Sequence, residues 1–234
     1  MKFKIVAVLL AFFMGLGSMA ITPPAKVEVN FANGLTKETV PQAVVDSIVS
    51  SNKGAANITI YEVGTLNDKS DDIVSGLENT PSNQQMDISR KPAFSYYKNI
   101  STKKTVTQTN ALAKDVFQFS VAKGQTVTLT MTYSASLTGS YSGTIVDVGN
   151  LGISGTVSGG YAKSTSYSGP GEGNVCNSRQ FRTKFFENRG TYVQTAEEWD
   201  WQGQGVNYKV GNVTTSGTFK EATIFANYSV DSIQ

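Results

Sequence analysis

The chain has 234 residues, of which 39% are hydrophobic and 16% are charged, with a formal net charge of +2; it contains no histidine and one cysteine, Cys176. Because histidine is the usual general base at neutral pH, and because structural zinc needs several histidine or cysteine ligands, this composition argues against Ser-His-Asp or Cys-His catalysis and against such metal sites. The sequence also lacks a P-loop, a dinucleotide-binding glycine fingerprint and a basic block, so we expect no enzymatic activity, no cofactor, no metal and no nucleic-acid partner.

Residues 1–20 have the pattern of a secretory signal peptide. Two lysines precede an unbroken apolar run at positions 5–14, and the small residues Ser18 and Ala20 stand where a signal peptidase requires them. We therefore expect the mature protein to begin at Ile21 and to be secreted to the extracellular space. Removal of the two lysines leaves equal numbers of basic and acidic residues in the mature chain.

The next part of the chain predicts a strand, a helix and a second strand. Residues 26–32 and 57–64 alternate between apolar and other side chains, as half-buried strands do. Between them, valine and isoleucine recur at helical spacing from near Pro41 to Gly54, two residue types that suit the first turn and the end of a helix. We expect this helix to pack its apolar stripe on a sheet.

Residues 65–87 are polar and rich in turn-forming residues, and their acidic side chains lack the ligand spacing of a calcium loop, so we expect a solvated loop. Strand patterns resume at 94–109 and 115–122 and continue to the C-terminus. The fold class is therefore predicted to be mainly β, with elongated antiparallel sheets, a long amphipathic Ser/Thr-rich hairpin and one N-terminal helix. We expect an N-terminal strand and helix region at 21–110 and an antiparallel β region at 111–234, which contains the hairpin at 126–168.

The predicted hairpin begins with a long two-faced segment. Every even-numbered residue from Thr126 to Thr144 is serine or threonine, whereas the odd-numbered residues from Val127 to Ile145 are valine, leucine, isoleucine, methionine, tyrosine, alanine or glycine. At about 3.3 Å per residue this arm could extend ~60 Å, and a strand needs only about 9–11 residues to cross a bilayer. Aliphatic and tyrosine side chains suit lipid and its headgroup region, and hydroxyl side chains suit a water-filled lumen.

This pattern resembles the insertion hairpin of aerolysin and epsilon-toxin-like β-pore-forming toxins. The resemblance implies a secreted protein that forms a homo-oligomer and inserts the hairpin into the lipid of a target cell, whose receptor the sequence does not identify. The residues that would then face the membrane are Val127, Leu129, Met131, Tyr133, Leu137, Tyr141, Ile145, Leu151, Ile153, Val157 and Tyr161. Two further stretches, SASLTGS and NSRQFRTKFF, are similar to secreted proteins of Gram-positive bacteria, which implies a bacterial origin.

The pairing of the two hairpin arms can be predicted from their glycines. The alternation breaks at 146–150, which predicts a five-residue tip. Pairing Ile145 with Leu151 then places Tyr141 opposite Gly155, so that large residues beyond the tip face small ones. We expect this register in preference to either neighbouring one, in which glycines face each other.

The C-terminal third predicts a hairpin with strands at 180–187 and 191–195 and a turn at 188–190, followed by further strands. Trp199 and Trp201 lie among acidic residues and are candidate glycan contacts, although the two rings could instead anchor this segment to the core. A carboxylate pair in the same segment could in principle hydrolyse a glycoside.

A second function remains open beside the pore former. Ser/Thr-rich ribbons also build the extended sheets of secreted surface proteins, where the apolar face is buried in a sandwich. The alternative is a secreted, non-enzymatic β-sheet protein that binds a glycan, the cell wall or a protein partner.

Overall fold

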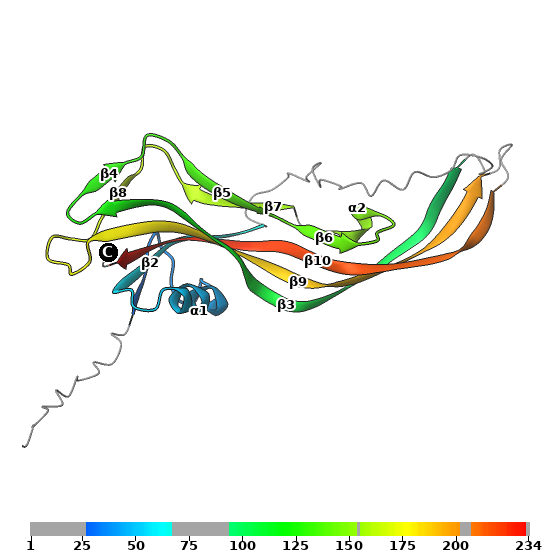
Figure 1. The fold of residues 1–234 in the computed structure, drawn as a ribbon, viewed down its shortest axis with the longest axis horizontal. Helices are drawn as coiled ribbons and strands as arrows, with labels where there is room; N and C mark the ends of the chain where they lie inside the picture. The colour runs from blue at the N-terminus through cyan, green and yellow to red at the C-terminus, as the bar shows by residue number, and fades with distance from the viewer. Residues whose placement is uncertain (1–26, 67–93, 154, 202–206, 233–234) are drawn as a thin grey trace, which may run out of the picture.

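The computed structural model describes residues 27–66, 94–153, 155–201 and 207–232 (Figure 1). This part of the chain is mainly β, as the alternating sequence pattern predicts, and the molecule is elongated. The signal peptide and most of the polar segment at 65–87 lie outside the described residues.

Three long antiparallel strands run along the molecule: β3 (Phe94–Ala122), β9 (Ser178–Trp201) and β10 (Asn207–Ser232). They belong to one sheet with the order β1-β2-β10-β9-β3, which we call the main sheet. The short strand β1 (Glu28–Phe31) pairs in parallel with β2 (Asn57–Thr65), and β2 pairs antiparallel with β10. β3 crosses the expected division of the chain at residue 110, so both expected regions contribute to this sheet.

Helix α1 (Gln42–Ser51) begins directly after Pro41 and packs on one face of the main sheet. Its Val44, Val45 and Ile48 are buried, because helical spacing brings these side chains to one stripe. They join a core with Ile58 and Ile60 of β2. The expectation that the helix packs its valine and isoleucine stripe on a sheet is therefore confirmed.

Two strand breaks expected from the sequence are absent from the long strands. β3 continues through residues 110–114 by means of bulges, and β9 continues through the expected turn at 188–190. Gly190 is required there for close contact and not for a turn: a Cβ atom on it would lie 2.2 Å from the Thr105 carbonyl oxygen and 2.7 Å from the Phe219 ring. The turn prediction is wrong because this position needs a glycine for a different reason: the Thr105 carbonyl and the Phe219 ring, both distant in sequence, lie too close for a side chain.

Residues 126–168, which we call the ribbon, lie along the other face of the main sheet (Figure 1). The ribbon contains six short elements, in chain order β4 (Thr126–Thr128), β5 (Tyr133–Thr138), β6 (Ser140–Gly143), α2 (Val148–Leu151), β7 (Thr156–Tyr161) and β8 (Ser166–Ser168). β4 pairs with β8 and β5 with β7, each as a separate two-stranded antiparallel sheet. The two arms therefore form a hairpin, as predicted.

The register of this hairpin differs from the prediction by two residues. Leu137 pairs with Val157, and Gly139 donates a backbone hydrogen bond of 3.0 Å to the carbonyl of Gly155, so two glycines do face each other. Tyr141 pairs instead with Phe219 of β10. The predicted five-residue tip is also wrong, because β6 leaves its partner arm and α2 forms a short helical turn.

Candidate functional site

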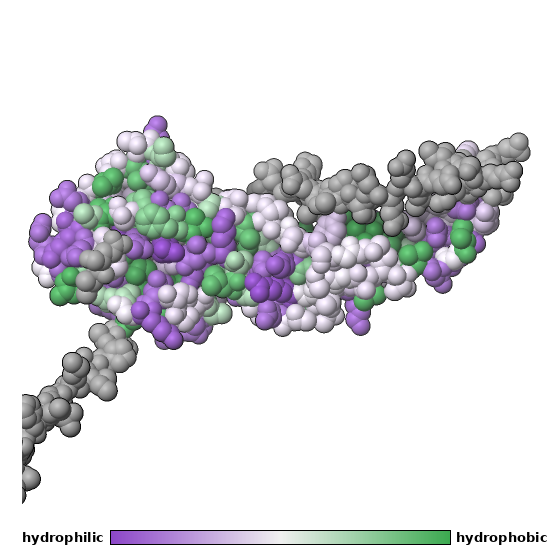
Figure 2. Space-filling model, viewed as in Figure 1, coloured by the Kyte–Doolittle hydropathy of each residue, from purple (hydrophilic) through white to green (hydrophobic). Residues whose placement is uncertain are grey.

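The ribbon separates its side chains into an outer polar face and an inner apolar face. Every even-numbered residue from Thr126 to Thr144 is exposed. Cross-strand hydroxyl pairs follow this outer face at Thr126 with Ser168 (2.8 Å) and at Thr138 with Thr156 (2.9 Å). Figure 2 shows pale residues, of intermediate hydropathy, over the middle of the visible face of the molecule. The outer face thus has hydroxyl groups where an ordinary surface strand often has charges.

The eleven residues expected to face a membrane lie mainly on the inner face. Four are buried: Leu129, Leu151, Val157 and Tyr161. Five are partly buried: Tyr133, Leu137, Tyr141, Ile145 and Ile153. Val127 and Met131 are exposed, at 42% and 58%. Nine of the eleven are therefore sheltered by the rest of the molecule.

In its middle, the ribbon is held by Phe185 and Phe225 of the main sheet. Val157 is buried against these two rings, and Leu137 packs beside them. Phe225 also covers Gly159, where a Cβ atom would lie 2.2 Å from Cδ2 of the ring. This contact explains the observed register, because Gly159 serves the phenylalanine ring of the sheet and not a large residue on the opposite arm.

At the root of the ribbon, aromatic rings gather around Phe181 of β9. Its ring is stacked on that of Phe119 with centroids 4.7 Å apart, and the rings of Tyr161 and Tyr167 meet it edge-on at 5.6 and 5.1 Å. The Tyr161 hydroxyl donates to the carbonyls of Arg182 (2.8 Å) and Tyr228 (2.9 Å). Burial of this hydroxyl raises the pKa of Tyr161 well above that of an exposed tyrosine.

Near its tip, the ribbon is clamped by Gln194 of β9, whose side chain is fully buried. The Gln194 Oε1 accepts from the backbone N–H groups of Val146 (2.9 Å) and Asp147 (3.3 Å). The Nε2 of the same residue donates to the Asp147 carbonyl (2.8 Å) and to the Thr102 hydroxyl (2.9 Å). Sequence reasoning missed Gln194, because nothing in a single strand indicates that its amide will meet a loop 47 residues away.

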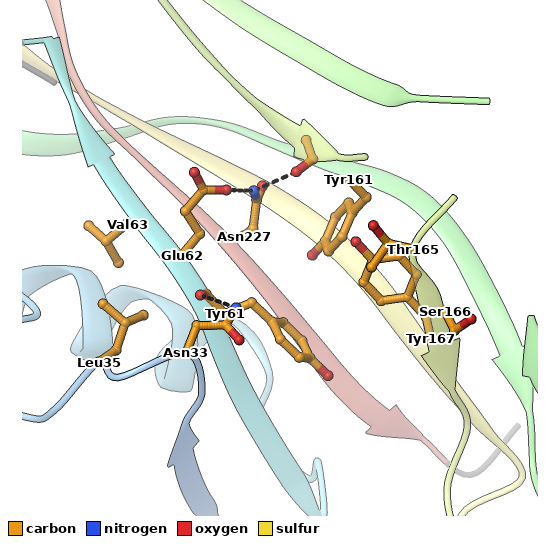
Figure 3. Close-up of a pocket in the computed structure, with 11 residues that line it drawn as sticks. Asn33, Leu35, Tyr61, Glu62, Val63, Tyr161, Thr165, Ser166, Tyr167 and Asn227 are labelled. Carbon is orange, nitrogen blue, oxygen red and sulfur yellow. Dashed lines mark hydrogen bonds between the residues drawn. The ribbon is translucent and has the colours of Figure 1, made fainter. Parts of the chain in front are cut away.

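A pocket of about 520 Å³ opens between the root of the ribbon and β2 (Figure 3). Its walls are formed by Asn33, Leu35, Tyr61, Glu62 and Val63 on one side, by Asn227 of β10, and by Gly160, Tyr161, Thr165, Ser166 and Tyr167 of the ribbon. No local pattern in the sequence indicates this pocket, because its walls come from three segments far apart in the chain.

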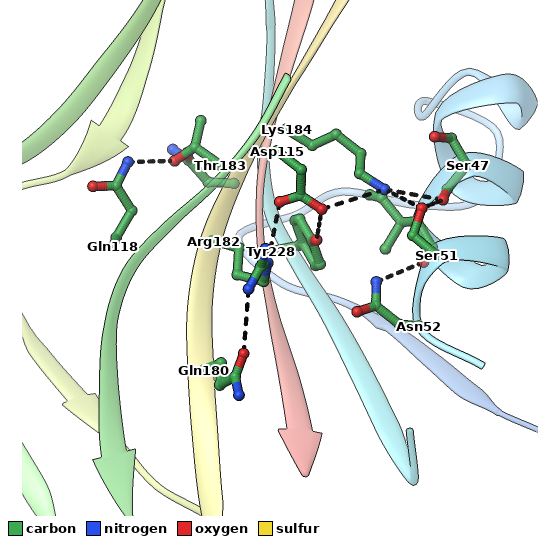
Figure 4. Close-up of polar contacts among 12 residues, drawn as sticks. Ser47, Ser51, Asn52, Asp115, Gln118, Gln180, Arg182, Thr183, Lys184 and Tyr228 are labelled. Carbon is green, nitrogen blue, oxygen red and sulfur yellow. Dashed lines mark hydrogen bonds and ion pairs between the residues drawn. The ribbon is translucent and has the colours of Figure 1, made fainter. Parts of the chain in front are cut away.

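On the face of the main sheet that carries α1, a polar cluster braces the helix (Figure 4). Asp115 of β3 accepts from Arg182 (3.1 Å) and from the Tyr228 hydroxyl (2.8 Å), and it lies 3.7 Å from the ammonium group of Lys184. Lys184 is fully buried and donates to the Ser47 carbonyl of α1 (3.0 Å). Burial lowers the pKa of Lys184, and burial followed by the charge of Asp115 raises that of Tyr228.

The two tryptophans lie at the far end of the main sheet, away from the ribbon root. The ammonium group of Lys98 lies 4.7 Å from the Trp199 ring centroid, and Trp201 is partly buried. Glu197 accepts from Lys209 (2.6 Å), Asn99 (2.9 Å) and Trp199 (3.2 Å), and the hydrogen bond from Lys209 is the main cause of its lowered pKa. This carboxylate is therefore held in place by three neighbouring side chains.

Cys176 is buried, and burial raises the pKa of its thiol, so the thiolate needed for reactivity is disfavoured.

No helix in the described ranges is long and apolar enough to cross a membrane. Comparisons of the chain with family models, curated proteins and solved structures found no match.

Proposed function

We propose that this is a secreted pore-forming protein that docks to a target membrane, forms a homo-oligomer and inserts the ribbon as an amphipathic β-hairpin. The observation that carries the proposal is the way in which the ribbon is stored. Its inner face is sheltered by side-chain packing, yet among the described residues its strand pairing to the main sheet is limited to the four residues of β6. Such a ribbon can detach from the main sheet without breaking the hydrogen bonds among β3, β9 and β10.

The chemistry of the two faces supports the same proposal. Once the ribbon leaves the main sheet, Leu137, Val157 and Tyr161 lose their cover, and exposing a large apolar side chain to water costs about 1.5–3 kcal/mol. Lipid removes that cost, and the hydroxyls of the outer face can line a hydrated lumen. The ribbon therefore suits two environments, the main sheet before insertion and the bilayer after it.

A disulfide between the ribbon and the main sheet tests the proposal. The hydroxyls of Ser142 on β6 and Thr218 on β10 are 2.8 Å apart, so cysteines at both positions would bridge the two strands. The double variant is made with Cys176→Ala to prevent mispairing. We expect the oxidised protein to release no dye from liposomes and to regain full release when the disulfide is reduced.

The matched control places cysteines at Thr126 and Ser168, whose hydroxyls are also 2.8 Å apart but which join the ribbon only to itself. This variant should release dye in both redox states. If the parent protein releases no dye from liposomes under any condition, the pore proposal is wrong and a binding function takes its place. Glycan arrays with the parent and Trp199→Ala would then test the glycan alternative.

A further inference from the structure

The pocket at the ribbon root has a wall shaped by a β-bulge. Asn227 of β10 pairs with Glu62 of β2, whereas Tyr228 pairs with Ile60, so Tyr61 is an extra residue with no partner in this ladder. Consecutive strand residues normally point to opposite faces, but a bulge redirects one of them. This bulge allows both Tyr61 and Glu62 to line the same pocket.

The pocket combines aromatic rings with a single negative charge. Tyr61 comes from the main sheet, and Tyr161 and Tyr167 come from the ribbon (Figure 3). Among the described residues of its walls, Glu62 is the only one with a charged side chain. The nearby Arg179, which contacts Tyr61 from outside the walls, is neutralised by Asp231 through bonds of 2.6 and 2.9 Å.

The carboxylate of Glu62 is fixed in place by a buried neighbour. Asn227 is 1% exposed, and its Nδ2 donates to Glu62 Oε2 (2.8 Å) and to the Gly160 carbonyl of the ribbon (2.7 Å). The Asn227 Oδ1 accepts from the Thr183 hydroxyl (2.8 Å), so the amide cannot rotate freely. One residue thus orients the charged wall and ties it to the ribbon.

We propose that this pocket binds an organic ammonium group of the choline type. Tyrosine faces attract such cations through their ring quadrupoles, and a carboxylate beside them supplies the opposite charge. The described wall residues offer no cationic side chain to an anionic ligand. A volume of about 520 Å³ is within the usual size of a small-molecule pocket.

An occupied pocket would join the ribbon to the main sheet, because its walls come from both. A ligand that binds only the docked arrangement stabilises that arrangement by mass action. The binding site itself does not depend on pore formation. Its role in holding the ribbon rests on the proposed function.

Calorimetric titration of the mature protein with choline chloride tests the site. The neutral isostere 3,3-dimethylbutan-1-ol, which has a carbon in place of the nitrogen, is the matched ligand control. We expect choline to bind and the alcohol to bind at least about tenfold more weakly. Absence of choline binding, or equal binding of both compounds, would overturn the proposal.

The matched protein variants are Glu62→Gln, which removes the charge but retains an oxygen for Asn227, and Glu28→Gln on β1. Both glutamates are exposed, so neither substitution should disturb the fold. Glu62→Gln should weaken choline binding at least about tenfold, and Glu28→Gln should leave it unchanged. Equal affinity of Glu62→Gln and the parent would show that the pocket is not the site.

Hydrogen exchange locates the ligand and separates this inference from the pore proposal. Choline should slow amide exchange at 160–167 of the ribbon and at 61–63 of β2, even in a protein that releases no dye. Unchanged exchange in both segments would contradict binding at this pocket.

Sedimentation with phosphatidylcholine or phosphatidylglycerol vesicles distinguishes a lipid headgroup from a soluble ligand. Glu62-dependent binding to phosphatidylcholine vesicles assigns a lipid headgroup, and binding of free choline alone assigns a soluble ligand.

Discussion

Phe225 of β10 covers Gly159 of the ribbon so closely that no side chain fits between them. A Cβ atom at Gly159 would lie 2.2 Å from Cδ2 and 2.8 Å from Cε2 of the ring, well inside contact distance. The contact joins the apolar face of the ribbon to the main sheet beside the cluster of Val157, Phe185 and Phe225. It is therefore a point at which docking of the ribbon can be changed by one methyl group.

Gly159→Ala should loosen the ribbon. The added methyl group must displace a buried phenylalanine ring, and overpacking of this kind costs about 1–3 kcal/mol. We expect a lower melting temperature and faster proteolysis within 126–168. Gly171→Ala, at a glycine with nothing within 4 Å of the added Cβ, is the control and should behave as the parent does. Unchanged proteolysis of Gly159→Ala would mean that the ring moves aside freely.

Gln194→Ala should free the tip of the ribbon. It removes the acceptor of the Val146 and Asp147 N–H groups, and a buried group left without a partner costs about 1–3 kcal/mol. Amide exchange at these two residues should become faster. Val193→Ala is the control, because Val193 is the neighbouring residue on the exposed face of β9 and is 41% exposed. Slow exchange at both amides in Gln194→Ala would contradict the clamp.

Leu137→Lys and Thr138→Lys test the two faces of the ribbon in a membrane. A lysine facing lipid near the bilayer midplane costs about 2–4 kcal/mol in each protomer, so Leu137→Lys should abolish dye release. Thr138→Lys, on the outer hydroxyl face, should retain release and change the ion selectivity of the channel. Circular dichroism of both variants checks that the main sheet is intact. Equal effects on release would contradict the assignment of faces.

Docking of the ribbon root should weaken at alkaline pH through Tyr161. Its pKa in the folded protein lies above that of the unfolded chain, so its contribution is complete below the unfolded pKa of about 10 and declines as the pH rises beyond it. Between pH 9 and 11 the parent should therefore lose more stability than Tyr161→Phe, which cannot ionise. At pH 7 the variant should be less stable, since two buried carbonyls lose their donor. Denaturant titrations at several pH values measure both effects, and parallel pH profiles would refute the assignment to Tyr161.

The hydroxyl face of the ribbon could be predicted from the chain alone. Strict alternation from Thr126 to Thr144 predicts this face, because successive side chains of a strand point to opposite sides. The expected continuous arm is nevertheless divided into three short strands, at 126–128, 133–138 and 140–143. The stripe of valine and isoleucine likewise predicted α1. These features depend on neighbours in the chain, so a local pattern is sufficient to predict them.

The register, the length of the long strands and the pocket depend on contacts between distant segments. Gly159 could have faced a large residue on the opposite arm, but Phe225 of the main sheet fills that space and a shift of two residues follows. Gly190 suggested a turn, yet it lies in a continuous strand beneath Phe219. Glu62 and Asn227 are 165 residues apart, and the bulge that brings Tyr61 beside them exists only because β2 and β10 pair. In each case the deciding contact comes from a distant part of the chain, where a local sequence pattern carries no information.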